Sequence, residues 1–204
     1  MTLQRFGTTG MTRNKVGIFG GTFNPIHRAH VAIALEFIEK FSLDLLYVIP
    51  NNIPPLKNSH GVSGNDRLCM LEIAFSGQEK VIISDTELKR GGMSYTCDTV
   101  AEIKANHPEA DLLLLVGDDW IDRFDMWKNY GDILDMATLV VAYRGIADID
   151  VHRERIYRKT GKEFLLLNNE KAELSSTDFR EAHDKSLLPD GVYEYIEERG
   201  LYRQ

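Results

Sequence analysis

The stretch VGIFGGTFNPIHRAHV, Val16–Val31, joins an apolar strand to a helix through a turn with two glycines and a proline. Gly20 and Gly21 are expected to let the backbone turn sharply and approach a ligand closely. His27 and His30 stand at the start of the predicted helix. Residues three apart share one helix face, so both imidazoles are expected to point toward one ligand beside the positive end of the helix dipole. That arrangement suits a polyphosphate.

The rest of the chain repeats this alternation of strand and helix. The predicted strands cover 16–19, 43–50, 81–84, 111–117, 138–144 and 163–168, and the predicted helices 30–41, 65–75, 96–107 and 130–137. In the first helix, a stripe of Val31, Leu35, Ile38 and Phe41 recurs at helical spacing. Strands that alternate with helices form right-handed crossovers, so we expect an α/β fold with a Rossmann-like, doubly wound, mostly parallel sheet. Ligands of such sheets bind beyond the carboxyl ends of the strands.

Composition narrows the class of protein. The 204 residues are 43% hydrophobic and 27% charged, enough to bury a sizeable core, and the formal net charge is -7. An acidic balance argues against a protein that coats nucleic acid or a membrane surface. No apolar run approaches the length of a membrane span, and we expect a cytoplasmic protein with reduced thiols at Cys69 and Cys97, inside helices. Residues 1–14 are expected to be a loose tail, 15–204 one domain, and 175–204 its helical C-terminal portion.

Two loops after predicted strands carry polar groups that have more than one interpretation. Three prolines stiffen the long loop after the second strand, where Lys57 either offers its ammonium to a phosphate or is a solvated surface charge. Later, Ser94, Tyr95 and Thr96 follow two glycines at a helix start, where hydroxyls and backbone N–H groups cap the helix or bind an anion.

Two more segments suggest a nucleotide. Asp119 follows the strand at 111–117, where a carboxylate accepts hydrogen bonds from ribose hydroxyls, and Trp127 offers an aromatic ring for stacking or a core side chain. Near the end of the sequence, Ser175, Ser176 and Thr177 crowd a helix start with Arg180 one turn further, which favours an anion site. Two anion-binding helix starts imply a ligand with several phosphates. Neither the G-x-G-x-x-G pattern nor the P-loop pattern is present.

Five of these motifs, in this order and at these separations, carry a resemblance to a known family. They are GGTFNPIHRAH, PPLK, SYTCDT, VGDDW and LSSTDFR. From about Lys15 onward the chain resembles the nicotinate mononucleotide adenylyltransferases of bacterial NAD synthesis, in the superfamily marked by H-x-G-H after the first strand. The resemblance implies transfer of AMP from ATP to the 5′-phosphate of a pyridine mononucleotide, by in-line attack without a covalent intermediate, with release of pyrophosphate.

The resemblance also implies roles for individual residues. The implied catalytic residues are His27, His30, Lys57 and Arg180. The implied ATP-binding residues are Gly20, Gly21, Thr22, Phe23, Ser175, Ser176 and Thr177. The implied acceptor-binding residues are Asn51, Tyr95, Thr96, Gly117, Asp119, Trp127 and Arg144. Mg²⁺ is expected to arrive with ATP, held mainly by phosphate oxygens and water, so no metal ligand is assigned to the protein.

The sequence departs from the family pattern at several positions. Ala29 stands where the family has glycine, Leu56 where it has histidine, and Met93 where proline is common. Asp118 and Trp120 replace small or apolar residues in the half of the site that binds the acceptor. These departures keep two alternatives open: another acceptor, such as nicotinamide mononucleotide or phosphopantetheine, and a non-catalytic nucleotide-binding regulatory protein. The sequence also leaves open a role for 145–162 and whether copies of the chain assemble into a homo-oligomer.

Overall fold

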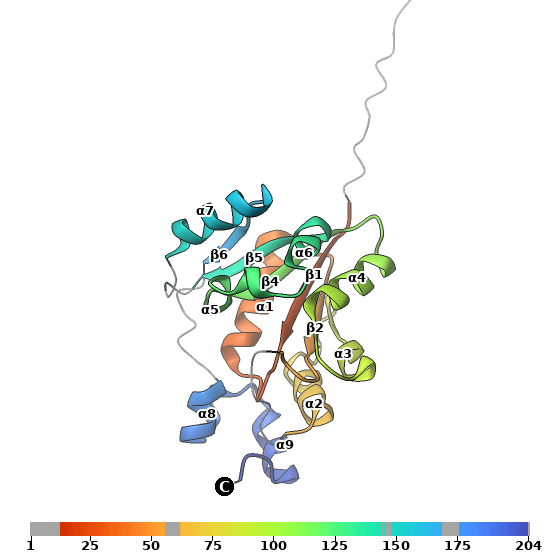
Figure 1. Ribbon diagram of the computed structural model, residues 1–204. Helices are drawn as coiled ribbons and strands as arrows, with labels where there is room; N and C mark the ends of the chain where they lie inside the picture. Colours follow the sequence, from red (N-terminus) through yellow and green to blue (C-terminus); the bar gives the residue numbers. More distant parts are fainter. Residues whose placement is uncertain (1–12, 56–61, 144, 146–147, 169–175, 204) are drawn as a thin grey trace, which may run out of the picture.

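A parallel sheet forms the centre of the protein (Figure 1). The computed structural model describes residues 13–55, 62–143, 145, 148–168 and 176–203. The strands in these parts are β1 (Lys15–Gly21), β2 (Leu45–Pro50), β3 (Val81–Ile83), β4 (Asp111–Gly117), β5 (Ala137–Tyr143) and β6 (Leu165–Asn168). Their order is β3-β2-β1-β4-β5-β6, and every neighbouring pair is parallel. The predicted doubly wound α/β fold is confirmed.

The strand order places a switch point between β1 and β4. From β1 the chain moves outward to β3, then returns past β1 to continue on its other side through β4, β5 and β6. Gly20 pairs in register with Ile49 of β2, and Phe19 with Leu115 of β4. The three strands therefore end at one edge of the sheet, which is where this class of fold binds its ligands.

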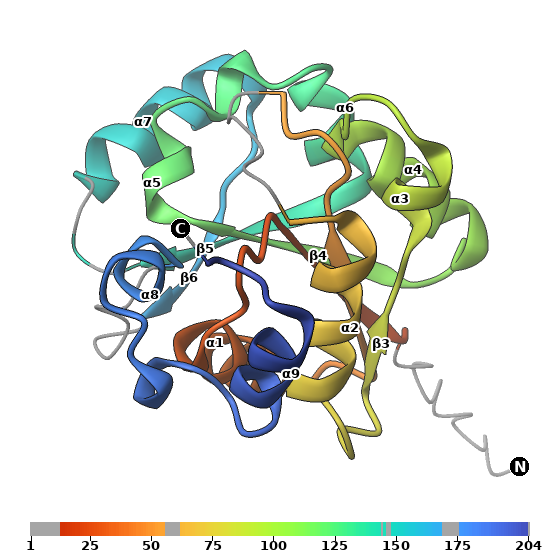
Figure 2. The ribbon, with the colours of Figure 1, turned by 90° about the horizontal axis from the view of Figure 1, so that it is seen from below.

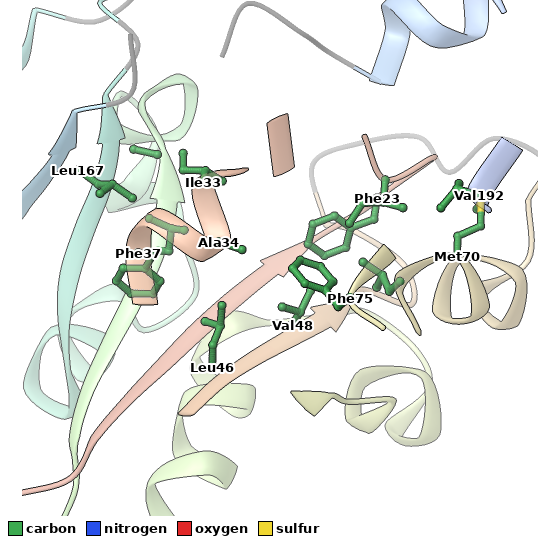
Figure 3. Packing of buried hydrophobic residues seen from close by; sticks show 14 of the residues in the cluster. Phe23, Ile33, Ala34, Phe37, Leu46, Val48, Met70, Phe75, Leu167 and Val192 are labelled. Atoms are coloured by element: carbon green, nitrogen blue, oxygen red, sulfur yellow. The ribbon is translucent and has the colours of Figure 1, made fainter. Parts of the chain in front are cut away.

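Side chains of the central strands alternate between two apolar clusters, one on each face of the sheet. In β4, Leu113 and Leu115 join one cluster, while Leu112, Leu114 and Val116 join the other. Burial on both faces is what the uninterrupted apolar run of this strand predicts. Figure 3 shows part of the first cluster, where Phe37, Leu46 and other side chains meet between helix and sheet.

Helices cover both faces of the sheet (Figure 2). The first cluster packs under α1 (Arg28–Phe41), α2 (Gly64–Ala74), α8 (Ser176–Ala182) and α9 (Val192–Arg199). The second packs under α4 (Thr96–Asn106), α5 (Asp118–Ile121), α6 (Tyr130–Met136) and α7 (Ile149–Thr160). The remaining short helices are α3 (Thr86–Arg90), η1 (Phe124–Met126) and η2 (Lys185–Leu187). Because α8 and α9 contribute to the first cluster, they share the core of the sheet.

Helix α1 forms as predicted, and its most buried side lies next to the stripe of apolar residues that recurs at helical spacing. The stripe that begins at Val31 is only partly buried, whereas Ile33, Ala34 and Phe37 are buried. The reason lies in β1, where Gly17 leaves room for a ring. A Cβ at Gly17 would lie 2.9 Å from Cε1 of Phe37. The helix therefore turns Phe37 onto the strand, and the stripe moves to its flank.

The two cysteines lie in helices, as expected. Cys69 belongs to α2 and Cys97 to α4, and both are free thiols. Burial raises the pKa of Cys97, which favours an unreactive, packed thiol. Within the described parts of the chain, no helix combines the length and the apolar character that a membrane crossing requires.

Candidate active site

A cavity of about 680 Å³ opens at the carboxyl ends of β1 and β4. Loops after β1, β2 and β4 line it together with the first residues of α1, α4 and α8. All predicted site residues that the structure describes line this one cavity: Gly20, Gly21, Thr22, Phe23, His27, His30, Asn51, Tyr95, Thr96, Gly117, Asp119, Trp127, Ser176, Thr177 and Arg180. Lys57, Arg144 and Ser175 lie outside the described residues, so their roles stay predictions.

His27 and His30 form one stacked unit at the start of α1. Their ring centroids are 3.6 Å apart, and the ring planes differ by 24°. The backbone N–H of His27 donates to Nδ1 of His30 over 3.3 Å. Because Nδ1 accepts this bond, a neutral His30 ring carries its proton on Nε2. The two imidazoles lie together, as their spacing predicts, and both line the cavity.

The loop between β1 and α1 turns at Phe23 rather than at the glycines, which corrects our expectation. Gly20 and Gly21 belong to β1, and neither has a positive φ, whereas Phe23 adopts φ 47. Gly21 is needed for another reason, since a Cβ there would lie 2.8 Å from the Phe23 ring. At Gly20 a Cβ would meet no protein atom within 4 Å. Gly20 therefore leaves open space along the cavity wall.

Arg180 ties α8 to this loop. Its guanidinium donates to the carbonyl of Asn24 over 2.6 Å and to the Thr177 hydroxyl over 2.8 Å. The Ser176 hydroxyl donates to the carbonyl of Pro25 over 2.8 Å. Two side chains of the predicted anion site, Ser176 and Arg180, therefore bond to the loop that leads to the histidines, and Arg180 brings a positive charge to the cavity wall.

Arg67 was not predicted as part of the site, although it holds two of the loops in place. This buried residue of α2 donates to the carbonyls of Thr22, over 2.8 Å, and of Asn51, over 2.7 Å. Burial lowers the pKa of Arg67. Its two acceptors directly follow β1 and β2, so one guanidinium fixes the ends of both strands relative to each other.

The loop before α4 is joined to the loop after β2. The Ser94 hydroxyl accepts a hydrogen bond from the backbone N–H of Asn52 over 2.8 Å, and the Ser94 N–H donates to the carbonyl of Ile53 over 2.9 Å. Gly91 and Gly92, with φ of 69 and 66, allow this approach. The motif that ends in Tyr95 and Thr96 is thereby held at the cavity, even though neither side chain caps α4.

Aromatic side chains form the far side of the cavity. The Trp127 ring contacts that of Phe124, with centroids 5.2 Å apart, and that of Trp120, 5.9 Å away. Trp127 therefore packs on the core and also lines the cavity, so it is a core side chain that also offers a ring face to a ligand. Lys128 lies with Nζ 4.4 Å from the centroid of the Tyr95 ring and 3.5 Å from Asp98. The half of the cavity around Tyr95 and Trp127 therefore combines flat aromatic faces with the positive charge of Lys128.

The polar groups of the cavity include an acceptor and two acids. Oδ1 of Asn51 is buried, and no described donor bonds to it, although its Nδ2 donates to Thr22. Glu87 is buried and accepts a 2.6 Å hydrogen bond from Thr99, while Asp119 is exposed. An acceptor such as Asn51 Oδ1 suits a ligand hydroxyl or amide hydrogen.

The sequence interpretation missed Asn24, Arg67, Glu87 and Lys128. Arg67 and Glu87 are charged residues of a type that is usually exposed, and nothing in the neighbouring sequence marks them as buried. Lys128 adjoins Trp127, which was recognised, so the pairing of an aromatic residue with a charge was an available signal. Asn24 stands inside the quoted opening stretch, where only its neighbours were assigned roles.

The chain matches known proteins over most of its length. A model of the family described as cytidylyltransferase-like matches residues 18–182. A Clostridium tetani protein named "Probable nicotinate-nucleotide adenylyltransferase" is 34% identical over 93% of this chain and 99% of its own length. A protein of the same name from Geobacillus thermodenitrificans is also 34% identical, over 92% of this chain and 86% of its own length.

Solved structures share the fold. A Plasmodium falciparum nicotinic acid mononucleotide adenylyltransferase complexed with NaAD superimposes with a TM-score of 0.77, at 22% identity, over 93% of this chain and 98% of that one. Likeness at this identity concerns the fold alone. The relatives from Clostridium tetani and Geobacillus thermodenitrificans, at 34% identity over more than nine-tenths of this chain, show the family. The chain therefore belongs to the cytidylyltransferase-like nucleotidyltransferases, within the family of nicotinate-nucleotide adenylyltransferases.

Proposed function

We propose that this enzyme transfers AMP from ATP to the 5′-phosphate of nicotinate mononucleotide, forming NaAD and pyrophosphate in NAD biosynthesis. The observation that carries the proposal is the cavity, which joins the stacked histidines and Arg180 to the aromatic wall around Tyr95 and Trp127. One half suits phosphates and the other suits a flat ring. The names of the relatives, and the NaAD complex of the Plasmodium falciparum protein, support the same substrates.

The proposed reaction is a single in-line displacement. An oxygen of the acceptor phosphate attacks the α-phosphorus of ATP, and the bond from that phosphorus to the bridging oxygen breaks as pyrophosphate leaves. No protein nucleophile takes part. The protein holds both substrates in line and stabilises negative charge, which accounts for most of the catalysis in transfers of this kind.

His27, His30 and Arg180 are the described residues proposed to stabilise that charge. With Nδ1 of His30 already accepting a bond, Nε2 is the nitrogen that donates to a phosphate oxygen. Arg180 adds a permanent positive charge at the same wall. Lys57 is proposed to share this role by its resemblance to the family motif.

The ATP side is proposed to lie along the end of β1 and the start of α8. The open space at Gly20 admits the nucleotide close to the backbone, and Gly21, Thr22 and Phe23 continue that wall. The hydroxyls of Ser176 and Thr177 face the same cavity and are proposed to contact the phosphates. The resemblance adds Ser175 to this set.

The acceptor side is proposed to lie between β4 and the aromatic residues. Trp127 and Tyr95 hold the pyridine ring, and Asn51 Oδ1 accepts a hydrogen bond from the acceptor. Thr96, Gly117 and Asp119 also line the cavity and are proposed to complete the pocket, where the Asp119 carboxylate accepts hydrogen bonds from ribose hydroxyls. The resemblance adds Arg144.

Mg²⁺ is proposed to enter as the complex of ATP. Of the described residues that line the cavity, only Glu87, which bonds to Thr99, and Asp119 carry carboxylates. Magnesium in nucleotide sites keeps several waters and binds substrate phosphates, so a lining with few carboxylates fits an ion held mainly by phosphate oxygens and water. The metal ion neutralises phosphate charge when bound.

The test measures pyrophosphate release from Mg-ATP with nicotinate mononucleotide, nicotinamide mononucleotide or phosphopantetheine, and compares kcat/KM for each. The highest value is expected for nicotinate mononucleotide, with NaAD identified by mass. A His30→Ala sample prepared in parallel reports any contaminating activity.

Activity with another acceptor alone would refute the proposed acceptor and keep adenylyl transfer. Silence with all three, from protein that binds α,β-methylene-ATP, would refute catalysis and favour a nucleotide-binding regulator.

A further inference from the structure

The loop between β1 and α1 is held from a distant part of the chain. The Tyr202 hydroxyl donates to Oδ1 of Asn24 over 2.6 Å, across 178 positions of sequence. Asn24 is 9% exposed and lines the cavity, and its carbonyl accepts the bond from Arg180. Side chain and main chain of one loop residue are therefore fixed by two different elements.

Tyr202 is itself fixed at three points. Besides the hydroxyl, its ring meets that of Phe179 of α8 edge to face, with centroids 5.8 Å apart. Its carbonyl oxygen lies 3.0 Å from Nε2 of His183. Its φ of 59 is left-handed, which costs a tyrosine about 1 kcal/mol. A costly backbone conformation persists where the surroundings determine it, and here those surroundings are α8 and the loop.

The hydroxyl remains a donor at every physiological pH. Burial raises the pKa of Tyr202, although the nearby charges of Arg180 and Arg67 oppose the shift. The ring therefore stays neutral. Both arginines already bond to the backbone of this loop, at Asn24 and Thr22. Tyr202 thus bonds to the same loop as these two arginines, and lies near enough for their charges to affect it.

We propose that Tyr202 is a positioning residue for ATP. It fixes the Asn24 side chain through its hydroxyl and holds α8 against the same loop through its ring. The loop and α8, which are the two cavity walls proposed to face the phosphates, therefore keep a fixed distance from each other. The inference rests on the proposed function, because it assigns the phosphates of ATP to these walls. It concerns ATP and not the acceptor, since the acceptor side is built from β2, β4 and the loop before α4.

The test compares Tyr202→Phe with Tyr195→Phe as a matched control. Tyr195 also donates its hydroxyl to a distant side-chain oxygen, that of Asp66 over 2.9 Å, and it does not line the cavity. Each variant loses one hydroxyl and keeps its ring. The measurements are the KM of ATP and of nicotinate mononucleotide, the Kd of α,β-methylene-ATP by calorimetry, and the urea midpoint.

Tyr202→Phe is expected to raise the KM of ATP and the Kd of the analogue about tenfold, with the acceptor KM within twofold of the parent. Tyr195→Phe is expected to lower the urea midpoint by about as much as Tyr202→Phe does. It is expected to leave the KM of ATP and the Kd of the analogue unchanged. Equal analogue Kd values in the two variants would overturn the inference. If the parent protein released no pyrophosphate with any acceptor, the proposed function would fail while the analogue Kd values still decided the role of Tyr202.

Discussion

Replacing the buried Arg67 by methionine should weaken both the fold and the site. Its guanidinium donates to two backbone carbonyls, of Thr22 and Asn51, at the ends of β1 and β2. Methionine fills a similar volume without a donor. Both carbonyls then lose their charged partner, and the loops that they belong to lose their common anchor.

The magnitude follows from the two bonds. A hydrogen bond from a charged donor contributes about 1.5–3 kcal/mol, so two give about 3–6 kcal/mol. Part of this is recovered because a buried cation no longer has to be desolvated. A net loss of about 3 kcal/mol remains, against a total stability of about 5–15 kcal/mol for a typical domain. For a chain of this size the corresponding fall in Tm is about 6–12 °C.

Calorimetric melting of Arg67→Met beside Arg28→Met tests this estimate. Arg28 also makes two contacts, with Asp190 at 2.8 Å and the carbonyl of Ser186 at 3.0 Å, but its side chain is 52% exposed. An exposed pair contributes about 0–1 kcal/mol, so that variant should melt within about 3 °C of the parent. The reasoning is refuted if both variants melt alike. At 20 °C, well below either midpoint, Arg67→Met should also lose at least tenfold in kcat/KM for ATP.

Three further predictions concern catalysis, the acceptor and acid stability. His30→Ala should lower kcat by a factor of about 10²–10³ with little change in Tm, since the role proposed for His30 is in the transition state. The rate of pyrophosphate release measures kcat, and near-normal turnover would remove His30 from the mechanism. Lys128→Gln should raise the KM of nicotinate mononucleotide and leave that of the uncharged carboxamide analogue unchanged; equal effects on both would contradict a charge interaction with the ring carboxylate. The hydrogen bond from Ser63, with smaller effects of Tyr195 and Arg199, lowers the pKa of Asp66 below its ordinary 3.8, so its contribution to stability is complete above that value and is lost as the pH falls further. Urea unfolding of Asp66→Asn between pH 5 and pH 3 should therefore show a flatter pH dependence than the parent, and an equal slope would contradict this.

The fold could be predicted because its signals are local. Buried parallel strands are runs of apolar residues, as in 111–117, and the structure places β4 on those residues. Short elements such as α3 and α5 were missed, because five and four residues are too few to show a helical period. Which residues of α1 are most buried does not follow from the spacing within the helix, because the place of Phe37 depends on Gly17, a residue of another element.

The site was predictable where its residues stand in loops after strands, because parallel strands bring those loops together. That rule brought His27, Asn51 and Thr96 to one cavity. It could not find Arg67, whose partners are backbone carbonyls 45 and 16 positions away. Carbonyls are the same in every residue, so no sequence pattern marks the side chain that binds them.

The bond between Tyr202 and Asn24 also bears on the order in which the protein is made. The ribosome synthesises Asn24 early, and Tyr202 follows only after a further 178 residues. The sheet strands are all synthesised before that, so we expect the nascent chain to fold its core while the loop beside His27 still lacks the hydrogen bond from Tyr202. Contacts this distant in sequence form late because the intervening chain must be ordered first. The nucleotide site should therefore be among the last parts of the protein to mature, and an incomplete chain that stops before Tyr202 should carry the fold without holding ATP tightly.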